Sequence, residues 1–194
     1  MGEVLIVLFA LVAGFPLPLT AAQILWLNLV TDGFMDVALS TEPKEKGLLR
    51  KRWLERRMRL VDTNILLKMF YVAIPMALGS LWIFNRYYQT NLALARTMTL
   101  IVMAMFQWFN AWNCRSERFS LFQIGLFTNK WLIITSVFVL ILQFLLLYTP
   151  WMQHIFKTVP LSAEQWHVIV LLTFPIIMLD EVRKWVVRRW VTKA

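Results

Sequence analysis

A carboxylate in the middle of a long apolar run constrains this chain more than any other feature of its sequence. Asp32 lies inside the run from Ala21 to Leu39, which is long and apolar enough to cross a membrane as a helix. A charged side chain at that depth costs on the order of 2.5–3.5 kcal/mol on insertion scales. We therefore treat Asp32 as a candidate functional residue and expect the rest of the chain to form its scaffold.

Other polar residues accompany this carboxylate along the run. Their spacing is i, i+3, i+4 and i+8, which places them on one face of an α-helix: Asn28, Thr31, Asp32 and Asp36. Gly33 follows at a point where a helix can open and leave backbone carbonyls free. Oxygen donors of mixed charge suit a hard cation that must shed its water. We expect a partially unwound helix that binds a cation.

Composition and the placement of charges indicate that this chain folds in a lipid bilayer. Of the 194 residues, 59% are hydrophobic, and the mean hydropathy is +0.61, as is typical of a polytopic membrane protein. The net charge of +9 is also found in nucleic-acid-binding proteins. However, 16 of the 20 Lys and Arg residues fall in alternate loops and in the C-terminal tail, which is the positive-inside pattern. We expect the lipid bilayer as a partner and no nucleic acid.

The apolar runs predict an all-α, polytopic membrane protein built as a six-helix transmembrane bundle. The predicted segments are a truncated first helix at 1–15, the ion-site helix at 20–40, a cytoplasmic loop at 41–61, further helices at 62–85, 95–114, 130–148 and 163–182, and a basic tail at 183–194. Six spans place both ends of the chain on the cytoplasmic side, at the plasma membrane if the source is prokaryotic.

Helix-start signals support several of these bounds. Thr20 with Gln23 and Ser162 with Gln165 each have the spacing of a capping box, and Asp62 can cap the helix that follows it. The basic loop at 41–61 has two interpretations: a solvated segment that sets topology, or a docking surface for a soluble domain.

The first apolar segment is too short to span. From Val4 to Phe15 it rises only ~18 Å, against a hydrocarbon core of ~30 Å. A helix that begins inside the membrane, with Glu3 at its open end, suggests that the chain is the C-terminal part of something longer. In that case Glu3 is a second carboxylate at membrane depth.

Two further residues are candidate ligands with alternative roles. Asp36 lies one turn beyond Asp32, where repulsion between the two acids favours a rim or entry role as much as ligation. Gln107 offers a neutral oxygen for an ion or an interhelical hydrogen bond. Near the C-terminus, Asp180 and Glu181 are expected to pair with neighbouring basic residues. No nucleotide-binding, nucleophile or other catalytic motif is present in the sequence.

The polar run resembles a known family. Gln23-Ile-Leu-Trp-Leu-Asn28-Leu-Val-Thr31-Asp32-Gly33, followed by Glu42-Pro43, resembles the sixth transmembrane helix of P-type cation ATPases of the calcium-pump branch. Met1-Gly2-Glu3-Val4 is similar to the fifth helix of that family, and Phe109-Asn110-Ala111-Trp112-Asn113 to the end of the eighth. The resemblance implies that the chain is the C-terminal transmembrane domain, helices five to ten.

The resemblance also implies ligands and an ion. Glu3, Asn28, Thr31 and Asp32 match ion-coordinating positions, and Gln107 stands where the two-site reticulum pump has a Glu, which implies one ion per cycle. The sodium–potassium pumps have an Asp at the position of Asn28, so the resemblance favours Ca²⁺ as the ion. Met35 and Asp36 depart from the family pattern, so Mn²⁺, Na⁺ and H⁺ remain alternatives.

The family's phosphorylation segment, nucleotide-binding domain and actuator domain do not occur in this sequence, so ATP and Mg²⁺ would act only in those missing parts. We interpret the chain as the membrane half of an ATP-driven Ca²⁺ pump, inactive alone, whose partners are the cytoplasmic and N-terminal transmembrane parts. The alternative is a stand-alone, non-enzymatic membrane subunit that binds or regulates a pump. A passive channel fits less well, because one asymmetric site in six helices offers no evident pore.

Overall fold

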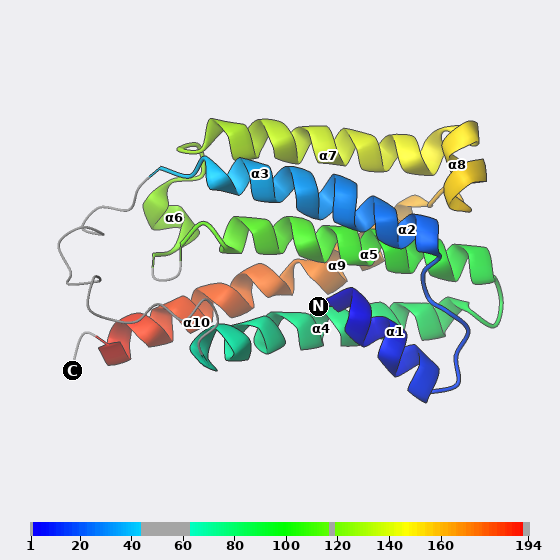
Figure 1. The fold of residues 1–194 in the computed structure, drawn as a ribbon, viewed down its shortest axis with the longest axis horizontal. Helices are drawn as coiled ribbons and strands as arrows, with labels where there is room; N and C mark the ends of the chain where they lie inside the picture. The colour runs from blue at the N-terminus through cyan, green and yellow to red at the C-terminus, as the bar shows by residue number, and fades with distance from the viewer. Residues whose placement is uncertain (1, 44–62, 117–118, 192–194) are drawn as a thin grey trace.

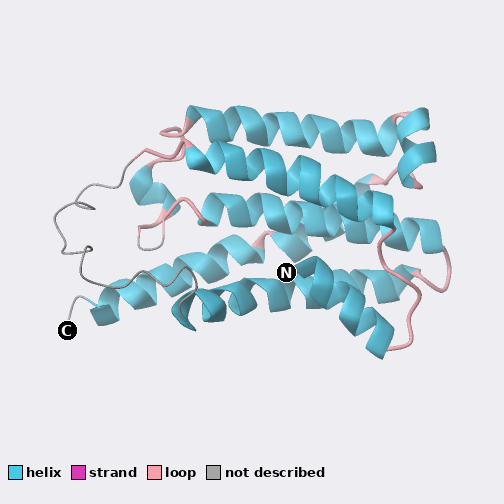
Figure 2. Cartoon of the chain, viewed as in Figure 1, coloured by secondary structure: helices cyan, strands magenta, loops and turns pink. Residues whose placement is uncertain are grey.

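A computed structural model describes residues 2–43, 63–116 and 119–191 of the chain, and all regular elements in these ranges are helical (Figures 1 and 2). The all-α membrane fold expected from the sequence is thereby confirmed. The elements in chain order are α1 (Gly2–Val12), α2 (Ala21–Trp26), the π-helix η1 (Leu27–Gly33), α3 (Phe34–Ser40), α4 (Thr63–Tyr87), α5 (Leu92–Asn113), α6 (Leu121–Ile124), α7 (Lys130–Tyr148), α8 (Pro150–Phe156), α9 (Ala163–Thr173) and α10 (Pro175–Val191).

Helix α5 is the centre of the bundle. Two thirds of its membrane-length window is buried inside the protein, against a third or less for the other long helices. In Figure 1 it runs between a layer formed by α7 and the α2–η1–α3 segment and a layer formed by α4, α9 and α10. Its buried side chains, from Met98 to Phe106, form the main hydrophobic core. Elements that pack on α5 are therefore positioned relative to one another.

Four helical segments have the length and apolar composition needed to cross a membrane. They are Leu67–Tyr87, Leu92–Asn113, Lys130–Tyr148 and Ala163–Val186, the last of which joins α9 to α10. The chain is therefore an integral membrane protein. Helix α1 has only eleven residues, and the α2–η1–α3 segment is divided by its change of helix type.

The ion-site helix does not unwind into extended chain. Its opening takes the form of the π-helix η1, in which the backbone keeps hydrogen bonds at the wider i→i+5 spacing. Gly33 ends η1, and a Cβ added there would lie 3.3 Å from the carbonyl oxygen of Asn28, five residues earlier. Glycine thus permits the close approach that the π-helix requires at this residue.

The helix-start signals are confirmed where the structure describes them. Thr20 with Gln23 forms a capping box at α2, and Ser162 with Gln165 forms one at α9. The predicted cap Asp62, most of the predicted loop at 41–61 and the last three residues of the basic tail lie outside the described residues.

The predicted pairing near the C-terminus is confirmed and proves to be buried. Asp180 contacts Arg183 at 2.7 Å and Lys184 at 3.0 Å, and the Lys184 side chain is fully buried. Lys184 Nζ also donates to the backbone oxygen of Asn113 at the end of α5, 3.0 Å away. Since a buried charge is tolerated only when it is paired and hydrogen-bonded, this cluster fixes α10 to α5.

Candidate cation-binding site

Two carboxylates from different helices approach each other beside α5. Glu3 lies in the first turn of α1 and Asp32 lies in η1, and both side chains are half-buried. The Gln107 amide nitrogen of α5 donates to Glu3 Oε1 at 3.2 Å and to Asp32 Oδ2 at 3.1 Å. One point therefore lies within hydrogen-bond distance of both acids, which is the arrangement that a shared cation needs.

Asn28 completes the group from within η1. Its Nδ2 donates to Glu3 Oε2 at 3.1 Å and to the backbone oxygen of Ile24 at 3.1 Å. The structure thus brings together four of the residues expected from the sequence: Glu3, Asn28, Asp32 and Gln107. Both amides now present their nitrogens to the carboxylates, so each would have to turn its oxygen inward to bind a cation.

The Gln107 amide is poised for such a turn. Its Oε1 is buried and has no hydrogen-bond partner in the described part of the chain. A buried acceptor without a partner costs roughly 1–3 kcal/mol. Rotation of the amide toward a cation between Glu3 and Asp32 would remove this cost and replace two donated hydrogen bonds by ion contacts.

Thr31 lies elsewhere. Its side chain is fully buried, and its Oγ1 accepts a hydrogen bond from Gln143 Nε2 of α7 at 3.3 Å. The expectation that Thr31 shares a face with Asn28 and Asp32 assumed α-helical spacing. Because η1 is a π-helix, its residues are distributed differently around the axis, and Thr31 faces α7 while Asp32 faces α5.

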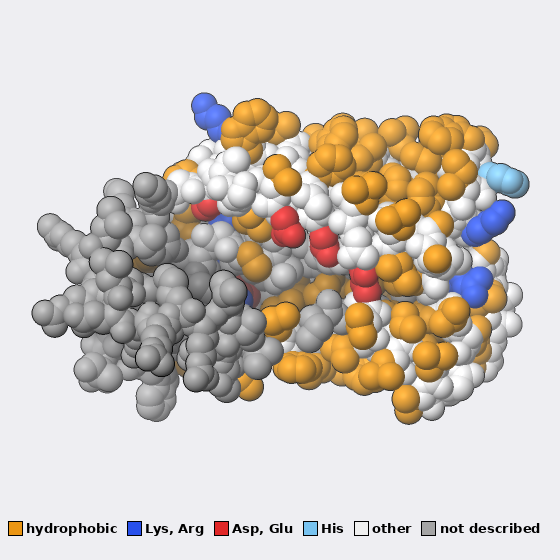
Figure 3. All heavy atoms as spheres, viewed as in Figure 1, with side chains coloured by type: hydrophobic (Ala, Val, Ile, Leu, Met, Phe, Trp, Pro, Cys, Tyr) orange, Lys and Arg blue, Asp and Glu red, His pale blue; other side chains and the backbone are white. Residues whose placement is uncertain are grey.

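Asp36 is exposed on α3 and makes no hydrogen bond or ion pair with another described residue. Figure 3 shows acidic side chains following one another in a row between α3 and the start of α1, with hydrophobic side chains on both sides. Asp36 is therefore not brought into the group around Gln107.

The donor set bounds what the group can bind. Two carboxylates and two amides offer at most six side-chain oxygens, and Ca²⁺ takes six to eight. All these donors are oxygens, which suit hard cations better than soft transition metals. Among the described residues, no group of three or more His, Cys, Asp or Glu side chains could hold a metal ion. The chemistry is that of a hard cation held by mixed acid and amide oxygens.

The C-terminal end of the α2–η1–α3 segment is held by a buried arginine. Arg115 Nη2 contacts Glu42 at 2.8 Å just beyond α3, its Nε donates to both Glu42 oxygens at 3.1 Å, and its Nη1 donates to the Gly125 oxygen at 3.1 Å. Asn129, the N-cap of α7, donates to Glu42 at 2.7 Å. The C-terminal ends of α3 and α5 and the N-terminal end of α7 are therefore joined.

The N-terminal end of the α2–η1–α3 segment is fixed as well. Gln23 is buried at the start of α2, and its Nε2 donates to the backbone oxygen of Phe156 in α8 at 3.0 Å. With both ends held, a change in the site is most easily absorbed in η1.

Comparison with known proteins identifies the family. The family model described as "Cation transporting ATPase, C-terminus" matches residues 16–186. The chain belongs to this family. The matched region contains Asn28, Thr31, Asp32 and Gln107 but begins after Glu3.

Curated relatives in this P-type ATPase family carry consistent names. The chain is 33% identical to mouse calcium-transporting ATPase type 2C member 1 over 92% of its length, 28% identical to a Plasmodium falciparum calcium-transporting ATPase over 97%, and 30% identical to a Bacillus subtilis calcium-transporting ATPase over 87%. The chain spans about a fifth of the length of these relatives, whose matched shares are 20%, 19% and 19%.

Sequence reasoning missed Gln143. It lies in the largely apolar helix predicted at 130–148, yet it hydrogen-bonds to Trp26 and Thr31 in the α2–η1–α3 segment. The signal that could have found it is its isolation, since a lone amide in a purely apolar span needs a buried polar partner.

Proposed function

We propose that this chain is the membrane half of an ATP-driven Ca²⁺ pump and that Glu3 and Asp32 hold the transported ion. The observation that carries the proposal is the Gln107 amide, which donates to both carboxylates from one nitrogen. A divalent cation between Glu3 and Asp32 would contact both acids and compensate both charges, with the Gln107 amide turned toward it. The names of the relatives support Ca²⁺ as the ion.

In this proposal the amides of Asn28 and Gln107 turn to supply neutral oxygens, and Thr31 contributes an oxygen while its hydroxyl keeps the hydrogen bond from Gln143. Asp36 attracts cations at the rim. Since the side chains of this group offer at most six oxygens, backbone carbonyls of η1 or donors outside this chain would complete the shell of the ion.

ATP hydrolysis, with its Mg²⁺, would take place in parts of the pump that are not in this sequence. Those cytoplasmic and N-terminal transmembrane parts are the proposed partners, along with the bilayer. Both ends of the chain would lie on the cytoplasmic side, because 16 of its 20 basic residues are in segments assigned to that side.

The test is Ca²⁺-dependent phosphorylation of the full-length protein that carries this chain, with Asp32→Asn compared with the parent. The variant keeps the shape of the side chain and removes its charge. Phosphorylation should require at least about a hundredfold more Ca²⁺, as expected for the loss of a direct charged ligand. Glu164→Gln, at an exposed position in the first turn of α9, is the matched control and should leave the Ca²⁺ dependence unchanged.

An unchanged Ca²⁺ dependence in Asp32→Asn would remove this residue from the site. If no ion-dependent phosphorylation accompanies the chain in its source, the stand-alone regulatory subunit becomes the better description.

A further inference from the structure

Gln143 is the single amide in the apolar helix α7, and it is 3% exposed. Its Oε1 accepts from the Trp26 indole nitrogen at 3.4 Å, and its Nε2 donates to Thr31 Oγ1 at 3.3 Å. Both partners are buried in the ion-site segment, one at the end of α2 and one in η1. One side chain of α7 thus links two turns of the helix that carries Asp32.

The spacing of the two partners depends on the π-helix. Trp26 and Thr31 are five residues apart. In an α-helix, residues five apart are rotated about 140° past a full turn, so they point away from each other. In a π-helix, where residue i bonds to residue i+5, they lie almost one above the other. A single amide can therefore reach both only while this segment keeps its π-helical form.

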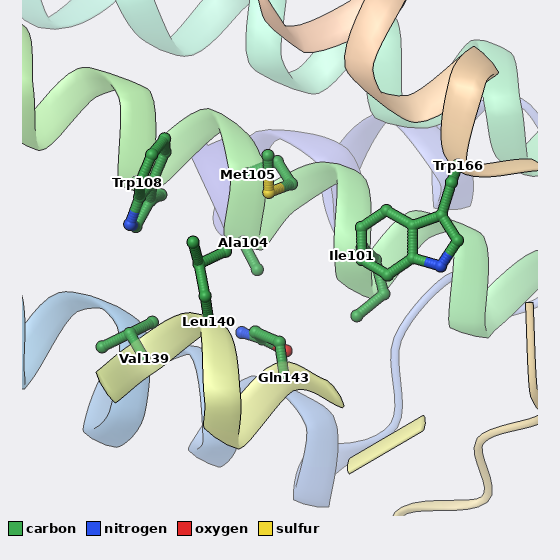
Figure 4. A pocket seen from close by; sticks show the side chains of 8 residues that line it. All are labelled: Ile101, Ala104, Met105, Trp108, Val139, Leu140, Gln143 and Trp166. Atoms are coloured by element: carbon green, nitrogen blue, oxygen red, sulfur yellow. The ribbon is translucent and has the colours of Figure 1, made fainter. Parts of the chain in front are cut away.

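The surroundings make the double hydrogen bond hard to replace. Gln143 also lines a small cavity between α5 and α7, together with Trp108, Met105 and Trp166 (Figure 4). It is the one amide among the eight lining side chains. Because a buried polar group without a partner is costly, the amide, the indole and the hydroxyl favour the one backbone form that satisfies all three.

The π-helical form of η1 also positions the carboxylate of Asp32. If η1 changed to an α-helix, each hydrogen-bonded turn would contain one residue fewer, and Asp32 would rotate by about 100° relative to Trp26. Since Gln107 contacts Asp32 from the separate helix α5, such a rotation would take Asp32 out of reach of the Gln107 amide and of Glu3.

We propose that Gln143 is a positioning residue that holds η1 in its π-helical form through Trp26 and Thr31 and so sets the cation affinity of the Glu3–Asp32 group. The part about affinity rests on the proposed function, whereas the part about helix form does not. Gln143 itself does not contact the ion.

The test of helix form uses the chain in lipid nanodiscs, with spin labels at Leu25→Cys and Val37→Cys on a Cys114→Ser background. Both labelled positions are exposed, at 65% and 68%, and they lie on either side of η1 in α2 and α3. Gln143→Met keeps the side-chain length and removes both hydrogen bonds. The distance distribution between the labels should shift or split in this variant. Leu142→Met, the neighbouring position in α7, is the control and should leave it unchanged.

Two partner variants keep the test decisive if Gln143→Met fails to fold. Trp26→Phe and Thr31→Val each remove one of the two hydrogen bonds, and each should produce part of the same shift. Combined with Gln143→Met, neither should add to it, because the hydrogen bond is already lost. An unchanged distribution in these variants would overturn the proposal.

The test of affinity is Ca²⁺ titration of phosphorylation in the full-length protein. Gln143→Met should raise the half-saturating Ca²⁺ concentration about tenfold, which is within the range expected when two buried hydrogen bonds are lost. Maximal phosphorylation should be retained. A shifted label distance with an unchanged Ca²⁺ dependence would overturn the link to affinity. If Asp32→Asn also left the Ca²⁺ dependence unchanged, the proposed function would fail, and the label distances would still decide the role of Gln143.

Discussion

Arg115 and Glu42 are 73 residues apart in the chain and meet at 2.8 Å, with the arginine side chain fully buried and the carboxylate 15% exposed. This ion pair lies at the C-terminal end of the α2–η1–α3 segment and also engages the loop before α7. It ties the segment that carries Asp32 to α5, the helix that carries Gln107. The two sides of the candidate site are thus held together at a point remote from Asp32.

Breaking this pair should destabilise the fold. Arg115→Met leaves the half-buried Glu42 without its cation and the Gly125 oxygen without its donor, and loss of one partner of a buried pair costs about 3–5 kcal/mol. Thermal unfolding of the chain in detergent should show a large drop in melting temperature. Arg86→Gln, at an exposed position on α4, is the control. Equal melting temperatures for the two variants would show that the pair does not support the fold.

Gln107→Leu should weaken both the fold and cation binding. The change removes the amide that donates to both Glu3 and Asp32. It leaves two neighbouring carboxylates facing an apolar side chain, which raises the cost of their charges. Added Ca²⁺ should then raise the melting temperature by less than it does in the parent. A variant that binds Ca²⁺ as well as the parent would exclude Gln107 as a ligand.

Asp36→Asn distinguishes a rim role from ligation. Because Asp36 is exposed and unpaired among the described residues, its removal should change the free energy of unfolding by no more than about 0.5 kcal/mol. Ca²⁺ affinity should fall about two- to threefold at low salt and should approach the parent value at high salt, where surface charges are screened. A large loss that persists at high salt would make Asp36 a direct ligand.

Gly33→Ala reports the form of the ion-site helix. In an ordinary helix interior this change stabilises by about 1 kcal/mol. At Gly33 the added Cβ would lie 3.3 Å from the Asn28 oxygen, so we expect that gain to be cancelled or reversed. Denaturant unfolding measures the difference. A full gain in stability would indicate that η1 relaxes to an α-helix.

The sequence alone was sufficient to locate the helices and to single out Asp32 as a candidate site residue. Apolar run lengths and capping residues locate most helix starts within a few residues, because these signals are local. Asp32 could be singled out because a charge within an apolar run is costly wherever the fold places it. Gln107 could be named as a candidate ligand because it is an amide within a membrane span, with an interhelical hydrogen bond as its alternative role.

The surroundings of Thr31 and the form of its helix depend on contacts between distant residues, which no local pattern encodes. Thr31 meets Gln143 across 112 residues of sequence, and this contact goes together with a π-helix that the α-helical spacing did not predict. The contact between Arg115 and Glu42 likewise depends on how α3, α5 and α7 pack. The spacing argument assumes one helix type throughout. It therefore placed Thr31 on the same face as Asp32, whereas Thr31 faces α7.

The most direct measurement is the position of the ion in an experimental structure of the full-length protein with bound Ca²⁺. The account predicts an ion with carboxylate oxygens of both Glu3 and Asp32 at about 2.3–2.6 Å and with the Gln107 oxygen turned toward it. An ion bound elsewhere, with the Gln107 nitrogen still donating to both carboxylates, would contradict the assignment of this site.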